Sequence, residues 1–340
     1  MTLDAAIADV ISGATGDESP AHAPLKNQHI LITGANGFLG RALVYSLHAQ
    51  TQLNLQLSAC VRNPERQLDI VNLQHCYWDM HSEQLPDLTH IDCIVHSAAR
   101  VHQLRETAAD PLAEFRRVNC AATLALAQAA IAAGVKRFIY ISSLHVLGHE
   151  RDQAYTGADI AAPTDPYAQS KWEAEQGLLA LADQIELVIL RPPLIYGRQS
   201  PGNFGRLVAL VNTGVPLPFG AITNRRSLVA VDNLVDLIVR CCWHSAAVGQ
   251  LFLVADSDAL STPALCAHIA RTLGKPSRQL KIPLSILKLG AGLLGKEAIY
   301  ARLAESLWVD DSATRQRLDW VPPLSTSIAL ARYLRGPKAP

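Results

Sequence analysis

The sequence has no excess of charge of either sign over its 340 residues, because 30 lysines and arginines balance 30 aspartates and glutamates. Proteins that bind nucleic acid or anionic surfaces through their overall charge show a basic excess, and this sequence does not. We therefore expect no nucleic-acid partner. Since 49% of the residues are hydrophobic, the chain can bury a large core and form one or two domains.

Metal-binding and targeting patterns are also lacking. The seven cysteines include no CxxC pair and no cysteine–histidine spacing typical of a metal site, so we expect reduced core thiols in a cytoplasmic protein and no metal. Residues 1–26 lack the features of a signal peptide and are expected to form a flexible extension. The apolar run from Ile282 to Leu294 contains Lys288 and is too short for a transmembrane segment. It predicts a helix of a small C-terminal domain, with a membrane-surface helix as the alternative.

The stretch DPYAQSK, residues 165–171, opens a run that predicts a helix. Asp165 is suited to cap this helix and Pro166 to occupy its first turn, where no N–H is needed. Tyr167 and Lys171 are four residues apart, so both project from one face. Because an ammonium stabilises a phenolate, we expect Lys171 to lower the pKa of Tyr167 from about 10 towards neutrality. The pair is a candidate for proton transfer, although many solvated helices carry a tyrosine and a lysine at this spacing.

A glycine turn follows the first apolar strand of the sequence. The strand pattern over 29–33, the turn GANGFLG and the helix pattern over 41–50 are typical of the first unit of a nucleotide-binding sheet. Gly34, Gly37 and Gly40 would let the backbone approach a pyrophosphate at the N-terminus of the helix. The spacing is GxxGxxG rather than the general GxGxxG, and a tight turn that binds no ligand is the alternative.

Strand patterns alternate with helix patterns along the chain. They cover residues 55–61, 75–80, 92–99, 137–143, 186–197 and 250–255, and a long helix pattern over 111–134 contains Asn119. This alternation predicts an α/β fold with a doubly wound, parallel Rossmann sheet and right-handed crossovers. Such sheets bind ligands at the carboxyl ends of their strands. The candidates at these ends are Asp79 for the adenine edge, Ser97, Ala98 and Ala99 for close approach of a cofactor, and Ser142 and Ser143.

The end of the second strand bears on the choice of cofactor. An acid at this point usually binds the ribose 2′-OH of NAD, whereas an arginine accommodates the 2′-phosphate of NADP. The sequence has Arg62 there and no acid. Arg62 therefore slightly favours NADP over NAD, with an ordinary exposed loop charge as the alternative.

The composition of the sequence changes after the predicted strand over 186–197. Residues 198–227 are rich in glycine, proline and asparagine, and short helix patterns alternate with prolines from about residue 256. We expect a dinucleotide-binding domain over 27–190 and 228–255. A smaller, interleaved C-terminal α/β domain over 191–227 and 256–335 would bind the substrate.

Seven motifs in this order carry a family resemblance: TGANGFLG, HSAA, VNCAAT, ISSLHVLG, YAQSK, RPPLIYG and RRSLVAVDNLVDLI. Together they resemble the extended short-chain dehydrogenase/reductases, the superfamily of nucleotide-sugar epimerases, dehydratases and reductases, over residues 28–335. AARVHQLRETAADPLAEFRRVN and PGNFGRLVALVNTGVPLPFGAITNRRSLV are similar to bacterial UDP-sugar 4-ketoreductases of surface-polysaccharide synthesis, of the UDP-N-acetylquinovosamine dehydrogenase type. Members of this group are often known as UDP-glucose 4-epimerases.

The resemblance implies a catalytic triad of Ser143, Tyr167 and Lys171, where Ser143 is chosen over Ser142 because it stands five residues before Gly148. It also implies that Asn119 supports Lys171 and the surrounding helix backbone. The cofactor-binding residues, from the patterns and the resemblance together, are Gly34, Gly37, Phe38, Leu39, Gly40, Arg62, Asp79, Met80, Ser97, Ala98, Ala99, Asn119, Tyr167, Lys171 and Pro193. The implied substrate-binding residues are Ser143, Asn203, Phe204, Arg226 for the diphosphate and Arg302 as a second phosphate ligand.

The sequence departs from the dehydratases of this superfamily, which carry an Asp-Glu pair where Leu144 and His145 stand here. Without either carboxyl group, elimination of water has no acid or base. The leading hypothesis is NAD(P)-dependent reduction at C4 of a UDP-4-keto-(6-deoxy) hexose for surface-polysaccharide synthesis. In this hypothesis Tyr167 donates a proton to the C4 oxygen, Ser143 holds that oxygen, and Lys171 tunes Tyr167 and binds the nicotinamide ribose.

Two other hypotheses stay open. The first is a UDP-glucose or UDP-N-acetylglucosamine 4-epimerase, which uses the same residues and keeps its NAD throughout. The second is a non-catalytic NAD(P)-sensing protein on the same fold. The resemblance also implies a homodimer formed through two helices of the sheet domain.

Overall fold

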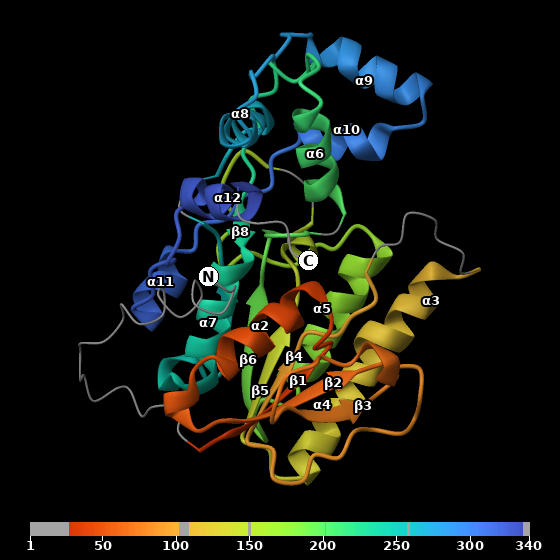
Figure 1. Ribbon diagram of the computed structural model, residues 1–340. Coiled ribbons are helices and arrows are strands. Elements are labelled where there is room, and N and C mark those ends of the chain that lie inside the picture. Colours follow the sequence, from red (N-terminus) through yellow and green to blue (C-terminus); the bar gives the residue numbers. More distant parts are fainter. Residues whose placement is uncertain (1–26, 102–108, 149–150, 201, 257–258, 336–340) are drawn as a thin grey trace.

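The computed structural model describes residues 27–101, 109–148, 151–200, 202–256 and 259–335, so the expected extension over 1–26 lies outside it. A seven-stranded parallel sheet forms its lower part, with the order β3-β2-β1-β4-β5-β6-β9 (Figure 1). Its strands are β1 (His29–Thr33), β2 (Gln56–Val61), β3 (Gln74–Tyr77), β4 (Cys93–His96), β5 (Arg137–Ile141), β6 (Glu186–Arg191) and β9 (Gln250–Leu253). The predicted doubly wound Rossmann sheet is confirmed.

Helices cover both faces of this sheet, which explains why its strands, apart from the edge strand β3, are mainly apolar runs without alternation. On one face, α2 and α7 pack with the strands into one hydrophobic core, and on the other face α4 and α5 do so. The helices of this part are α2 (Phe38–His48), α3 (Pro111–Phe115), α4 (Ala122–Ala132), α5 (Pro166–Leu179) and α7 (Val231–Trp243).

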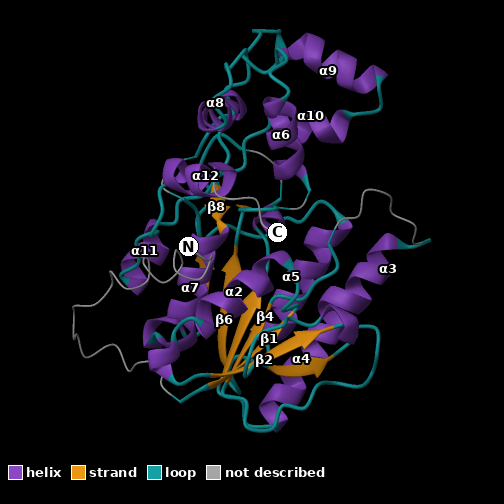
Figure 2. Cartoon of the chain, viewed as in Figure 1, coloured by secondary structure: helices purple, strands orange, loops and turns teal. Residues whose placement is uncertain are grey.

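The predicted strand over 186–197 is divided into two. β6 ends at Arg191, and β7 (Leu194–Tyr196) pairs in parallel with β8 (Leu228–Ala230) in a separate two-stranded sheet. Pro192 and Pro193 lie at the break, where they provide no backbone N–H for continued pairing. The prolines therefore direct the chain out of the main sheet; Figure 2 shows β8 above it.

The remaining helices belong to the upper part in Figure 1, apart from α11. They are α6 (Asn203–Asn212), α8 (Thr262–Thr272), α9 (Leu284–Leu293), α10 (Glu297–Ala304), α11 (Ser312–Leu318) and α12 (Thr326–Arg335). Side chains of α6, α8 and α12 share a hydrophobic core with β7 and β8, distinct from the two cores beside the main sheet. The division into two interleaved domains at the boundaries given above stays a prediction.

Candidate active site

Helix α5 begins where the sequence predicts. Asp165 is its N-cap and accepts a hydrogen bond from the backbone N–H of Ala168 at 2.9 Å, and Pro166 occupies the first turn. The helix fixes Tyr167 and Lys171 one turn apart, so that both face the carboxyl end of β5. Helix capping thus determines where the two candidate groups lie.

Ser143 and Tyr167 meet at the end of β5. The Ser143 hydroxyl shares a hydrogen bond with the Tyr167 phenol. Ser142 points elsewhere, because its hydroxyl donates a hydrogen bond to the buried carboxylate of Glu175. The geometry separates the two serines as the count from Gly148 predicts, and the catalytic role of Ser143 stays a prediction.

His145 is a third group at this point, and the sequence did not indicate it. Its backbone N–H donates to Ser143 Oγ at 3.2 Å, and its ring Nδ1 lies 3.2 Å from the same oxygen. His145 is exposed, whereas Ser143 is only 6% exposed. Ser143 therefore connects the Tyr167 phenol to an imidazole in contact with solvent.

The expected lowering of the Tyr167 pKa is wrong for the protein's own groups. Burial raises this pKa to about 12, and the hydrogen bond from Ser143 lowers it only in part. Lys171 is not aimed at the phenol, because its Nζ donates to the Ile141 carbonyl oxygen at 2.8 Å and lies 4.6 Å from the Tyr140 ring centre. At neutral pH, Tyr167 is therefore a protonated phenol and a ready proton donor.

Lys171 itself is the strongly perturbed group of the pair. It is 2% exposed, and burial lowers its pKa to about 7, although the Glu175 carboxylate one turn later raises it. Glu175 is fully buried and accepts hydrogen bonds from Arg191 Nε at 3.0 Å and Arg191 Nη2 at 2.5 Å. A buried ion pair thus lies behind Lys171 on the same face of α5.

The lowered pKa of Lys171 predicts a pH-dependent stability. Its ordinary value is 10.5, so between pH 7 and about 10 the unfolded chain binds more protons at this lysine than the folded protein. This group therefore makes stability rise with pH. Relative to Lys171→Met, the free energy of unfolding of the wild type should increase by about 4 kcal/mol over this window. Urea unfolding of both proteins at several pH values measures the difference, and a constant difference would contradict the buried amine.

The glycine turn is built for close backbone approach. Gly34 has φ +66°, and a Cβ there would lie 2.9 Å from the backbone of Ala98, after β4. A Cβ on Gly40 would lie 2.2 Å from the Gly34 carbonyl oxygen. Helix α2 follows directly, with Gly37 as its N-cap and no side-chain cap among the described residues. These features fit a dinucleotide pyrophosphate, which would take hydrogen bonds from the backbone N–H groups of Phe38 and Leu39.

Small residues after β4 continue this surface. The Ser97 hydroxyl donates to the Thr33 carbonyl oxygen at 2.7 Å, and the Ala98 N–H donates to Thr33 Oγ1 at 3.2 Å. Ser97, Ala98 and Ala99 are partly exposed. They join the ends of β1 and β4 beside the glycine turn, as the sequence predicts for residues against which a cofactor lies.

His96 supports this surface from below and was not identified from the sequence. It is fully buried, with Nδ1 2.8 Å from Thr33 Oγ1 and Nε2 2.9 Å from Thr123 Oγ1. Burial, with a contribution from Lys171, lowers its pKa to about 3, so the imidazole is neutral. Its two hydroxyl partners join β1 to α4 beneath the glycine turn.

Asn119 lies within a wide, π-helical turn (Arg116–Ala121) that interrupts the predicted helix over 111–134. It is 1% exposed; its carbonyl oxygen accepts from the Arg100 N–H at 2.8 Å, and its amide donates to the Arg100 carbonyl oxygen and Ser170 Oγ at 3.0 and 3.1 Å. Its described contacts thus reach Ser170, the neighbour of Lys171, rather than Lys171 itself. Such single wide turns are frequent at functional sites.

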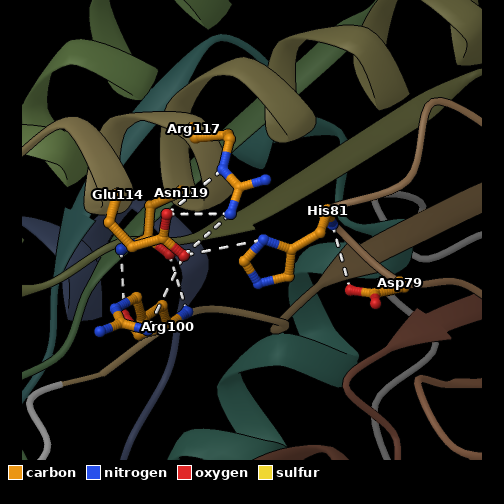
Figure 3. Close-up of polar contacts among 6 residues, drawn as sticks. All are labelled: Asp79, His81, Arg100, Glu114, Arg117 and Asn119. Carbon is orange, nitrogen blue, oxygen red and sulfur yellow. Dashed lines mark hydrogen bonds and ion pairs between the residues drawn. The ribbon is translucent and has the colours of Figure 1, made fainter. Parts of the chain in front are cut away.

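Glu114 organises the side of the site next to Asp79 and Asn119 (Figure 3). Its carboxylate lies 2.9 Å from Arg117, 3.7 Å from His81 and 3.9 Å from Arg100. His81 is joined to Asp79 by a backbone N–H that donates to the Asp79 carboxylate at 3.1 Å. This cluster connects the loop after β3 to α3 and to the segment after β4. Motifs and spacing do not indicate this cluster, because its three segments, at residues 79–81, 100 and 114–119, are separated along the chain.

The other predicted cofactor residues lie just beyond the ends of β2, β3 and β6 or at the start of α2. Arg62 is exposed directly after β2, and the described structure gives no test of an NADP preference, so that preference stays a prediction. Met80 packs against the core beside β3, and Pro193 is buried at the break after β6. Leu39 is also a core residue, so only its backbone is available to a ligand.

The predicted substrate residues lie mainly in the upper part. Arg226 Nη1 donates to the Glu305 carbonyl oxygen at 3.0 Å, at the end of α10, which also carries the exposed Arg302. Asn203 is exposed at the start of α6. Phe204 differs from the prediction, because it is 3% exposed and packs against Tyr196 with ring centres 5.1 Å apart. Its side chain belongs to the hydrophobic core and is not available to a substrate.

Neither a metal site nor a membrane-spanning helix is found among the described residues. No group of three or more His, Cys, Asp and Glu side chains is placed to hold a metal ion in the described part of the chain. No helix within the described ranges is both long and apolar enough to cross a membrane.

The NAD dependent epimerase/dehydratase family model matches residues 30–255. The chain is 42% identical over 302 residues to a UDP-glucose 4-epimerase of Vibrio cholerae, covering 86% of this chain and 90% of the relative. It is 29% identical over 276 residues to the N-acetyl-alpha-D-glucosaminyl-diphospho-ditrans,octacis-undecaprenol 4-epimerase of Escherichia coli O157:H7, covering 77% and 78%.

Solved structures share the fold at lower identity. The Bacillus cereus UDP-glucuronic acid 4-epimerase, in complex with UDP-glucuronic acid and NAD, is similar with a TM-score of 0.73, 21% identity and coverage of 91% of this chain and 98% of that one. The Streptomyces venezuelae dTDP-glucose 4,6-dehydratase DesIV, with NAD bound, has a TM-score of 0.72, 22% identity and coverage of 91% and 96%.

Proposed function

The chain belongs to the NAD dependent epimerase/dehydratase family, and from this premise we propose that it is a UDP-hexose 4-epimerase that retains its NAD. The 42% identity to the Vibrio cholerae UDP-glucose 4-epimerase supports this activity more than the reduction that the sequence predicts. The chain is an epimerase/dehydratase-type enzyme in either case. The finer question is which reaction at C4 it completes.

The observation that carries the proposal is the hydrogen bond between Ser143 and Tyr167 beside the glycine turn, without carboxylates at the next two positions. Leu144 is fully buried, and the His145 ring turns to Ser143. Neither residue can act as the carboxylic acid or carboxylate that elimination of water requires. The site therefore supports proton transfer at a hydroxyl and not dehydration.

The roles of the side chains follow from their contacts. NAD, when bound, supplies the chemistry of accepting and returning a hydride. Tyr167 first gives its own proton, through Ser143, to the exposed His145. As the phenolate it takes the C4 hydroxyl proton in one half-reaction and returns it to the same oxygen in the other, and Ser143 holds that oxygen by a hydrogen bond. Lys171 places its amine close to this chemistry, where the nitrogen donates a hydrogen bond to the Ile141 carbonyl oxygen.

We assign the sugar nucleotide to the upper part because of the arginines that this part carries. A UDP-hexose carries a diphosphate, which a forked guanidinium binds well. Arg226 and Arg302 lie on adjoining segments there, and we assign both to the diphosphate within the substrate domain (191–227 and 256–335). Cofactor binding is assigned to residues 27–190 and 228–255, and a homodimer of this unit is part of the same proposal.

A specific feature favours a second candidate, the UDP-sugar 4-ketoreductase. Reduction of a ketone consumes one proton in each turnover, whereas epimerisation consumes none. Tyr167 is protonated at neutral pH, and Ser143 connects it to the exposed His145, which offers a route for a proton from solvent. Arg62 adds a modest preference for an exchangeable NADPH.

One experiment separates the two candidates. Purified protein given UDP-glucose and no added cofactor should form UDP-galactose, because a retained NAD serves both half-reactions. The same protein given NADPH and a UDP-4-keto-6-deoxyhexose should leave the absorbance of the reduced nicotinamide unchanged. The opposite pair of results would establish the ketoreductase, and no turnover in either assay would leave a dinucleotide-sensing protein.

A further inference from the structure

Helix α9 lies outside the hydrophobic cores of the described structure. It has ten residues, LSILKLGAGL, and none of them is buried. Figure 1 shows it at the tip of the upper part, where α10 is its neighbour and the main sheet is far below. A largely apolar helix that buries no side chain gains nothing from the protein core, so its composition calls for another explanation.

The exposed side chains of this tip are large and apolar. Ile286 is 59% exposed, Leu289 65%, Leu293 80% and Leu294 69%. Leu280, just before α9, is 49% exposed, and its backbone N–H donates to the Leu217 carbonyl oxygen, close to the exposed Val215. The apolar surface therefore extends from α9 to the segment after α6 and forms a patch rather than isolated side chains.

The charges along residues 261–296, which include α9, have one sign, although the whole protein is neutral. Every charged side chain from Ser261 to Lys296 is basic, and all are exposed: Arg271, Lys275, Arg278, Lys281, Lys288 and Lys296. The first acid is Glu297, which together with Glu305 and Lys288 lines a hollow at α9 and α10, so that two carboxylates offset part of this charge. The tip around α9 is thus basic and apolar, although the net charge of the chain is zero.

We propose that this tip, α9 with the basic residues from Arg271 to Lys296, docks on the surface of an anionic lipid bilayer. A helix with exposed Leu and Ile side chains, one lysine and further basic residues on either side fits the boundary between headgroups and acyl chains. A second copy of this chain fits poorly, because pairing of the two tips would bring like charges together. The protruding shape also suits a deformable surface, since a rigid partner would need a deep groove.

Docking in this way orients the enzyme. Helix α10, which carries Arg302, follows α9 directly, so the phosphate-binding end of the upper part would face the headgroups. The main sheet and its glycine turn would lie on the side away from the bilayer. The chain would therefore bind peripherally through this tip, and none of the helices in the described ranges would cross the membrane.

The test uses the full-length protein and two kinds of vesicle. Co-sedimentation should show binding to vesicles of equal parts phosphatidylglycerol and phosphatidylcholine, and at least about tenfold weaker binding to pure phosphatidylcholine vesicles. Added salt should weaken the binding, because screening acts on the basic residues. Ile286→Asp/Leu289→Asp/Leu293→Asp should lower binding by more than about tenfold, because three carboxylates replace the inserted apolar groups.

A matched triple variant controls for added charge. Val71→Asp/Ile160→Asp/Val321→Asp places the same three carboxylates at positions that are 77%, 90% and 76% exposed outside the tip, and it should lose far less binding. All six positions are exposed, so both variants should fold, which circular dichroism checks. Equal loss in both variants, or no preference for phosphatidylglycerol, would overturn the proposal. So would concentration-dependent dimers that only the tip variant abolishes, since the tip would then bind a second copy.

Discussion

Tyr167→Phe is expected to lower kcat by about a hundredfold to ten-thousandfold, the usual range for loss of a positioned acid–base group. The variant removes one oxygen atom and leaves the ring, which lies edge-on to Phe115 with centres 6.0 Å apart. The ring packing should therefore survive, and the loss should fall on proton transfer. Steady-state kinetics with the substrate that the wild type accepts measures the effect.

Two controls support this interpretation. Dinucleotide binding by Tyr167→Phe, followed by intrinsic fluorescence, should change little, because the cradle of Gly34 and Gly40 is untouched. Tyr45→Phe removes a phenol that is 41% exposed on α2, and its kcat should stay at the wild-type level. Full activity of Tyr167→Phe would remove Tyr167 from the mechanism, whichever reaction at C4 the enzyme performs.

Arg191→Met is expected to lower the free energy of unfolding by about 3–5 kcal/mol, measured by urea denaturation. The side chains of Arg191 and Glu175 are only 6% and 0% exposed and are joined at 2.5 Å. The variant leaves a buried carboxylate whose described hydrogen bonds then come only from Ser142. The expected loss of unfolding free energy reflects the uncompensated charge of the buried Glu175 carboxylate, and it does not measure the strength of the Arg191–Glu175 ion pair.

The chain offers a matched control for this prediction. Arg117→Met breaks an ion pair with Glu114 at 2.9 Å, but the Arg117 side chain is 55% exposed, so its effect should stay within about 0.5 kcal/mol. The double variant Arg191→Met/Glu175→Leu removes both buried charges and should recover most of the loss. An equal effect of Arg117→Met and Arg191→Met would mean that burial does not control the strength of these pairs.

The main sheet could be predicted from the sequence because its signals are local. Each strand apart from the edge strand β3 is a short, mainly apolar run, and the glycine turn and the Asp165–Pro166 cap mark the boundaries of α2 and α5. The strand over 186–197 was predicted too long, because the effect of Pro192 and Pro193 on sheet pairing outweighs the apolar character of the residues after them. The π-helical turn at Asn119 leaves no mark in a sequence of good helix formers.

The candidate site was only partly accessible from the sequence. Motifs located Ser143, Tyr167 and Lys171, since Ser143 follows the end of β5 and the other two lie one turn apart in the first half of α5. The pKa values could not be predicted, because they depend on burial and on partners distant in the chain. Lys171 stands over Tyr140 and in front of the ion pair of Glu175, and spacing alone does not reveal that setting.

Leu144 has a consequence for how this enzyme could change in evolution. Its side chain is fully enclosed by a cluster that includes Val146, Leu147 and Tyr155. An aspartate substituted there would lie among buried apolar side chains, where the ionised form of a carboxylate is unfavourable. A single mutation at Leu144 is therefore not expected to produce a dehydratase, because the neighbouring side chains would have to become polar at the same time. In this chain, epimerisation and dehydration are thus separated by the free-energy cost of burying a carboxylate. The residues that set this cost are those that enclose Leu144.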